Sequence, residues 1–263
     1  MEVAYYKKLF QTIGNIIELI EKDDIPKYLL FLENAFPYMD NYNYHKGMNG
    51  IIQELTGLLK TKNIGTDSDR ALLLDFQATL ETKPEKAIKL EKDALAQIET
   101  ITADNARLVS NLHANLGGLY RMNGHPDLAR EHMEKSISLL DQFNLLHIND
   151  SIPQIANYAM FLTEQQEPER GISELQKLSG IIKEYHSDDC LDYAKVQETL
   201  GTIYLMTANL PQAKTHFKRA FKIYEKIWAD EPEMIEAKYQ EIQELYPQIG
   251  FCIGKKLSGL LTK

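Results

Sequence analysis

The chain has 263 residues, of which 44% are hydrophobic and 25% charged, and its formal net charge is −9 at pH 7. This composition is ordinary for a folded soluble protein, and the acidic balance argues against a nucleic-acid-binding surface, which would need a basic domain or stripe. No apolar run approaches the roughly 18 residues that cross a membrane, and the two cysteines lack metal-ligand spacing, which favours a reducing compartment. We therefore expect a cytoplasmic protein that binds neither nucleic acid nor membrane.

Residues 1–65 contain three segments with amphipathic helical patterning, at 5–22, 24–40 and 44–60. Two interpretations are open for this region. The segments are either degenerate repeats that cap the remainder of the chain, because terminal repeats are usually atypical, or a separate three-helix element packed on the first repeat.

Residues 66–230 contain an internal repeat of about 42 residues. Prolines recur at 84, 126, 168 and 211, each after a polar break and before an amphipathic run. Proline is favoured in the first turn of a helix, where its missing N–H is not needed. Small residues recur in the same register at two positions of the repeat, which are Gly117, Ala159 and Gly201, and then Ala87, Ala129, Gly171 and Ala213. The pattern predicts four hairpins of two amphipathic helices, in which the small residues let the two helices approach closely.

The turn between the two helices of a hairpin is clearest in the sequence NGHP, residues 123–126. Gly124 follows the predicted end of one helix and Pro126 opens the next, which is the usual distribution of these residues at helix ends.

Two of the four units resemble the tetratricopeptide repeat. Leu116-Gly117-x-x-Tyr120 followed by Ala129 fits that pattern, as does the longer series Leu200, Gly201, Tyr204, Ala213, Phe217 and Ala220. The first and third units depart from it, with Asp75 and Ala78 in one and Leu162 in the other. The 42-residue period is similar to the long repeats of kinesin light chain. The resemblance implies an all-α, right-handed superhelical solenoid of antiparallel helix hairpins.

In the tetratricopeptide family the concave surface lined by the first helix of each hairpin binds peptides or partner helices, so the resemblance implies a non-catalytic protein-binding scaffold. Asparagine suits this role because its amide both donates and accepts hydrogen bonds, and a glycine on the surface lets a ligand backbone approach. The positions that the resemblance assigns to partner binding are Asn111, Asn115, Gly118, Arg121, Asn157, Met160, Lys195, Thr199 and Thr202.

Motifs for catalysis or cofactor binding are not found in the sequence, which has no Walker A, GxGxxG, HExxH or GxSxG pattern. We therefore expect no enzyme activity and no cofactor. The densest group of metal-ligating side chains is 186–190 (HSDDC). Its place in a polar turn favours a different role, with Ser187 or an Asp as the N-cap of the next helix.

Two other functional classes remain open from the sequence. Similar repeats form the peptide-binding part of bacterial regulators, so the chain could be a peptide-sensing regulatory protein or the sensor domain of a larger regulator. An accessory subunit of an enzyme is the third possibility.

Residues 231–263 are expected to cap the solenoid. The segment 232–246 has helical patterning and is expected to be broken or kinked at Pro247. The last residues, 248–263, are unusually apolar, so they are expected either to fold back as a further helix or to form a homodimer interface. Small residues spaced by four, Gly250, Gly254 and Ser258, favour folding back, and hence a monomer.

Overall fold

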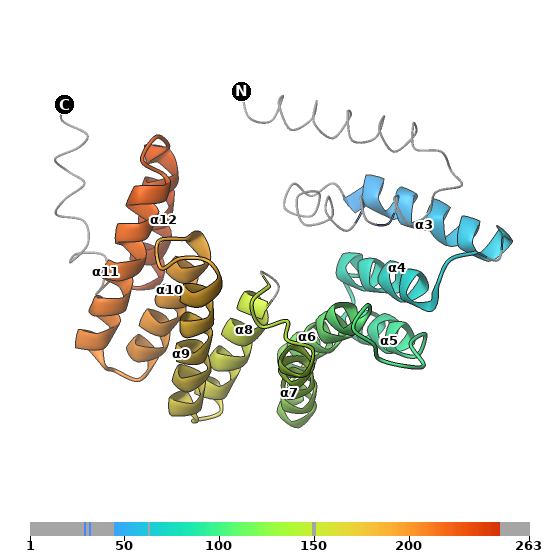
Figure 1. The fold of residues 1–263 in the computed structure, drawn as a ribbon, viewed down its shortest axis with the longest axis horizontal. Helices are drawn as coiled ribbons and strands as arrows, with labels where there is room; N and C mark the ends of the chain where they lie inside the picture. The colour runs from blue at the N-terminus through green and yellow to red at the C-terminus, as the bar shows by residue number, and fades with distance from the viewer. Residues whose placement is uncertain (1–28, 30–31, 33–44, 63, 149–150, 248–263) are drawn as a thin grey trace. The chain divides into compact units, whose positions relative to one another are not determined.

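The computed structural model describes residues 29, 32, 45–62, 64–148 and 151–247, and every regular element among them is an α-helix (Figure 1). The predicted segment 5–22, all but two residues of the segment 24–40, and the tail 248–263 lie outside the described residues. The helices are α3 (His45–Lys62), α4 (Asp67–Leu80), α5 (Pro84–Leu95), α6 (Ala106–Met122), α7 (Pro126–Gln142), α8 (Ser151–Glu164), α9 (Pro168–Tyr185), α10 (Leu191–Met206), α11 (Leu210–Ile227) and α12 (Pro232–Leu245). None of the described helices combines the length and apolarity needed to cross a membrane.

The helix boundaries follow the repeat found in the sequence. Pro84, Pro126 and Pro168 open α5, α7 and α9, and Pro211 is the second residue of α11. α12 ends at Leu245, before Pro247, as predicted. In chain order, α4 and α5, α6 and α7, α8 and α9, and α10 and α11 occupy the segments that the sequence assigns to the two helices of each hairpin.

The turns inside three of these pairs, α6–α7, α8–α9 and α10–α11, share one backbone conformation. Gly124, Gln166 and Ala208 occupy the same position of the repeat, and their φ angles are +75°, +64° and +59°. In each turn the next N–H donates to the carbonyl five residues earlier, as His125 does to Tyr120 at 2.9 Å and Asn209 does to Tyr204 at 2.7 Å. This is the Schellman ending of a helix. The prediction at Gly124 is confirmed, and the other two turns adopt the same geometry without glycine.

The chain forms two compact units, residues 1–132 and 133–263, with the boundary inside α7. In the first unit α3 packs on α4 around buried side chains that include Leu32, Met48 and Ile52. The α4–α5 pair then packs on α6 through Ala71, Ala94 and Leu112, each fully buried.

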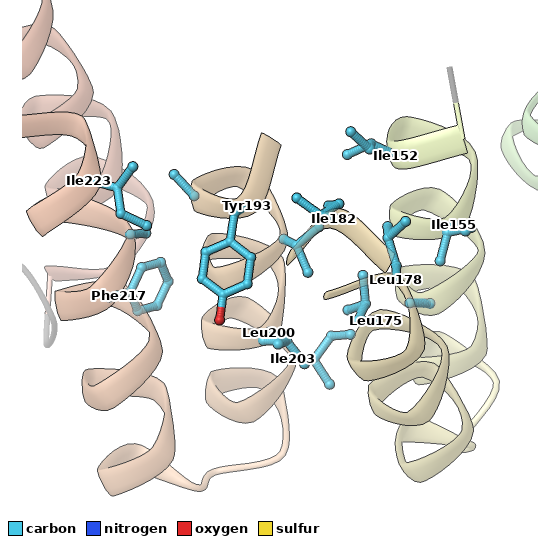
Figure 2. Close-up of a cluster of buried hydrophobic side chains, with 14 of the residues drawn as sticks. Ile152, Ile155, Leu175, Leu178, Ile182, Tyr193, Leu200, Ile203, Phe217 and Ile223 are labelled. Atoms are coloured by element: carbon cyan, nitrogen blue, oxygen red, sulfur yellow. The ribbon is translucent and has the colours of Figure 1, made fainter. Parts of the chain in front are cut away.

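The second unit has a continuous core that runs through α8, α9, α10 and α11. Figure 2 shows its side chains projecting between the helices, with Leu175 and Leu178 of α9 beside Ile155 of α8, and Phe217 of α11 beside α10. α12 closes this core through Ile242, which is buried. Aromatic contacts support the closure, because Tyr239 of α12 lies against Phe221.

The small residues of the repeat mark close helix contacts, as predicted. A Cβ at Gly201 would lie 2.9 Å from the ring of Phe217 in the partner helix, and one at Gly171 would lie 2.6 Å from the carbonyl oxygen of Ala159. At Gly118 a Cβ would meet nothing within 4 Å, whereas the adjacent Gly117 is buried. The two neighbouring glycines therefore serve different faces of α6.

Candidate functional site

All the residues predicted to bind a partner lie on the first helices of their hairpins. Four of them lie on α6 in the first unit, and five lie on α8 and α10 in the second unit. The two groups are therefore considered separately.

The group in the second unit lies on two helices that contact each other, α8 and α10. Asn157 on α8 and Lys195 on α10 are exposed, while Thr199 and Thr202 are partly exposed. Met160 is half-buried because it also packs against the core of this unit. We call the surface formed by Asn157, Met160, Lys195, Thr199 and Thr202 the α8–α10 face.

The polar groups that α10 contributes to this face are held in place by contacts within the helix. The hydroxyl of Thr199 donates to the carbonyl of Lys195 at 3.0 Å, and that of Thr202 donates to the carbonyl of Glu198 at 3.1 Å. The hydroxyl oxygens retain acceptor capacity after these bonds are made. Lys195 lies 3.7 Å from Asp192, one turn earlier on α10. The face therefore offers an amide, two hydroxyl acceptors, a thioether and an ammonium group.

A buried ion pair that the sequence did not predict borders the face. Lys238 of α12 lies 2.8 Å from Glu198 of α10, and both side chains are about four-fifths buried. The hydroxyl of Tyr224 donates to the same carboxylate at 2.6 Å. Burial alone would lower the pKa of Lys238, but its contacts with Glu198 and Glu241 raise it above its ordinary value. No sequence signal points to this pair, because α12 lies outside the repeat register.

The group in the first unit is less available for a partner than its sequence suggests. Asn115 is exposed, but its amide nitrogen donates to the Oδ1 atom of Asp75 on α4 at 2.8 Å. Asn111 and Arg121 are half-buried on the same helix, and Gly118 leaves an open space beside them. Asn115 therefore joins two helices of this unit.

Two tyrosine–histidine stacks recur at equivalent positions of the repeat. Tyr120 stacks on His132 with ring centroids 5.4 Å apart, and Tyr204 stacks on His216 at 5.2 Å. These are the tyrosines of the repeat pattern, and their histidine partners on the second helix were not predicted. Each histidine also bonds to the first helix through Nδ1.

The partners of the two histidines differ between the hairpins. His132 Nδ1 lies 2.9 Å from His113 Nδ1, whereas His216 Nδ1 lies 2.9 Å from the Oε1 atom of Gln197. Burial lowers the pKa of His132 and that of His216 below the ordinary value, and the nearby cations Lys92 and Arg219 act in the same direction.

The stretch 186–190 is not arranged as a metal site. No group of three or more His, Cys, Asp or Glu side chains in the described part of the chain is placed to hold a metal ion. The predicted N-cap is wrong: the sulfur of Cys190, not Ser187 or an Asp, accepts the N–H of Tyr193 at 3.4 Å. α10 begins directly after Cys190, so Ser187 is too far upstream and instead accepts the N–H of Asp189 in the preceding turn.

Comparison with known proteins finds similarity to a repeat family and to solved helical-repeat structures. Residues 151–226 match the family model described as tetratricopeptide repeat. No curated protein matches the chain. The crystal structure of BtubC (BKLC) from P. vanneervenii is similar with a TM-score of 0.57 and 16% identity, and the match covers 91% of each chain.

Two further solved structures contain nearly identical TPR-like repeats assigned to a kinesin light chain of Podosopora anserina. One of them, a form with a single substitution, has a TM-score of 0.56 and 15% identity, over 75% of this chain and 96% of that one. The other form has a TM-score of 0.54 and 15% identity, over 74% and 96%. At identities this low, the structural similarity shows a shared fold and nothing further.

The family match and the all-helical repeat architecture agree with the sequence pattern. Repeats of this family stack into scaffolds for protein interaction and are typically non-catalytic. Residues 151–226 therefore match the tetratricopeptide repeat, and the fold of the chain is similar to that of kinesin light chain TPR-like repeats.

Proposed function

We propose that the chain is a non-catalytic scaffold that binds an extended segment of a partner protein on the α8–α10 face. The observation that carries the proposal is that α8 and α10 are in contact while their polar residues at 157, 195, 199 and 202 remain at least partly exposed. Stacked first helices are the surfaces that helical repeats offer to partners.

The chemistry of the face favours contact with a peptide backbone. The amide of Asn157 can donate to a backbone carbonyl and accept a backbone N–H at once, and the oxygens of Thr199 and Thr202 can accept further N–H groups. Met160 offers a flexible apolar surface that adapts to different side chains. Hydrogen bonds to the backbone hold an extended segment, and the apolar contact adds preference for its side chains.

The residues of α6 form a second group to be tested separately. Gly118 leaves room for a ligand backbone, and Asn111 and Arg121 flank it along the helix. The amide nitrogen of Asn115 already donates to Asp75, so we expect Asn115 to add less to binding than Asn157 does.

Selection from a displayed library of random 12-residue peptides, panned against the full chain, tests the proposal without a known partner. The selected peptide is then labelled, and its affinity is measured by fluorescence anisotropy. We expect Asn157→Ala combined with Thr199→Val to weaken binding by about tenfold or more, because two hydrogen-bonding groups are lost at about 0.5–1.5 kcal/mol each.

Lys218→Ala is the matched control, because Lys218 is exposed on α11, a second helix of its hairpin. It should leave the affinity unchanged. Selected peptides whose binding is lost in Lys218→Ala but kept in the double variant would contradict the proposal, since they would place the binding surface on the second helices.

A further inference from the structure

The first hairpin replaces an apolar contact of the repeat with two carboxyl groups. In the α10–α11 hairpin Gly201 accommodates the ring of Phe217. Leu175 of α9 occupies the position of Phe217 one repeat earlier, and Met133 of α7 occupies it two repeats earlier. Both are also buried. In the α4–α5 hairpin the residues in the same register are Asp75 and Glu91.

Glu91 is as deeply buried as the apolar residues it replaces. Its side chain is 1% exposed, and its Oε2 atom is buried without a hydrogen-bond partner. Its carboxyl group lies within interaction range of Asp75 of α4 and of Asn115 of α6. Asn115 also donates to Asp75 at 2.8 Å, so the three side chains link three helices of the first unit.

Two carboxyl groups in such a contact cannot both be charged without a large penalty. A buried carboxylate loses its hydration, and a like charge in contact adds repulsion. When one group keeps a proton, its O–H donates to the other and both penalties fall. Asp75 already accepts a bond from Asn115, which stabilises its charged form, so the proton belongs on Glu91.

We propose that the Asp75–Glu91 pair is a proton-holding contact which loosens the α4–α5 hairpin, and its junction with α6, as the pH rises above neutrality. Loss of the proton to solvent leaves two adjacent carboxylates between the helices. The hairpin responds by opening, which hydrates both charges.

The groups around the pair support this assignment. Asp75 supplies the charge that favours the protonated form of Glu91, and the hydrogen bond from Asn115 of α6 opposes it as the smallest of the effects on this carboxyl group. Lys92, the next residue of α5, lies over the ring of Tyr120, 5.5 Å from its centroid. Burial raises the pKa of Glu91 well above its ordinary value, with Asp75 acting in the same direction.

Hydrogen–deuterium exchange of the full chain between pH 6 and pH 9 tests the proposal, with amide rates corrected for the intrinsic effect of pH. Local opening of α4 and α5 should increase with pH, by up to about tenfold per unit, because one proton is released on opening of the protonated pair. In Glu91→Gln the corrected opening should be independent of pH, since the amide keeps the shape and the hydrogen bonds but cannot ionise. Amides of α10 and α11 should be the same in both proteins.

Glu85→Gln is the control, because Glu85 is an exposed residue in the first turn of α5. It should keep the pH slope of the wild type. Glu91→Met places at this position the residue type that Met133 contributes one repeat later, removes the ionisable group and should also flatten the slope, which preserves the test if Glu91→Gln does not fold. The proposal would be overturned if the opening of α4 and α5 in a folded variant rose with pH as steeply as in the wild type. It would also be overturned if the variant and the wild type differed only by a factor that is the same at every pH.

Discussion

At the scale of single residues, the shared turn conformation shows where the repeat is under backbone strain. Ala208 has a φ of +59° in a turn where Gly124 stands two repeats earlier. A left-handed conformation costs a residue with a side chain about 1–2 kcal/mol, and glycine avoids this cost. The strain is local, because Ala208 is exposed.

Ala208→Gly should therefore stabilise the protein. We expect a gain of roughly 0.5–1 kcal/mol, since the greater freedom of glycine in the unfolded chain offsets part of the relief. Gly124→Ala should lower the free energy of unfolding by a similar amount. Urea denaturation of the three proteins measures both changes, and a loss of stability in Ala208→Gly would show that this turn is not strained.

Two glycines on first helices should respond oppositely to the same substitution. Gly118→Ala should be neutral or stabilising by up to about 1 kcal/mol, because alanine is the better helix former and the new methyl group has open space. Gly201→Ala should destabilise by about 1–3 kcal/mol, because its Cβ would overlap the fully buried ring of Phe217. Thermal melting compares the two, and equal shifts would contradict the assigned faces.

The sequence predicted these two glycine environments because the repeat register separates buried from open positions. It could not predict that Asn115 would bond to Asp75, 40 residues away. That contact depends on side-chain directions across three helices, which a one-dimensional period does not contain. The Cys190 cap was missed for a related reason, since sulfur is not among the usual capping groups.

At the scale of helix pairs, the two tyrosine–histidine stacks make part of the stability dependent on pH. Burial holds the pKa of His132 and that of His216 below the ordinary value near 6.5. As the pH falls through about 6.5, the unfolded chain gains protons that the folded hairpins do not bind. Stability contributed by these sites is therefore present above that pH and lost below it.

His216→Gln should lose less stability than the wild type between pH 7.5 and pH 5.5, because the protonating side chain is gone. Urea denaturation at the two pH values measures the difference. His125→Gln, which removes an exposed imidazole at the start of α7, is the control and should behave as the wild type does. An equal loss in His216→Gln and the wild type would show that this stack does not contribute to the acid sensitivity.

Helix pairs were the part of the fold that the sequence predicted best. Proline spacing and small residues located α4 to α11, and Pro247 located the end of α12. The histidines that stack on the tyrosines were not predicted. They are His132 and His216, and the repeat between them has Glu174 at the equivalent position. A position that changes chemistry from repeat to repeat gives no periodic signal.

At the scale of the whole molecule, α12 should act as the cap that the sequence predicted. Tyr246 lies against Phe217 with ring centroids 5.9 Å apart, and Lys238 pairs with Glu198. Removal of the helix would expose the apolar face of α11 and leave Glu198 without its buried counter-charge.

A chain truncated after residue 230 should therefore melt at a lower temperature than one truncated after residue 247, which keeps α12. Deletion of 248–263 alone should lower the melting temperature slightly and leave the protein monomeric by light scattering, in keeping with a tail that folds back. A dimeric full chain and a stable monomeric truncation would instead make the tail the interface.

The pairing of charges beside the α8–α10 face has a consequence for how a partner would arrive. Glu198 is matched by Lys238 and Lys195 by Asp192, so the face carries little charge of its own within a molecule of net charge −9. At about 0.1 M salt, fields from distant charges are screened beyond roughly 10 Å. Association through this face should then proceed without long-range steering, at a rate that changes little with ionic strength.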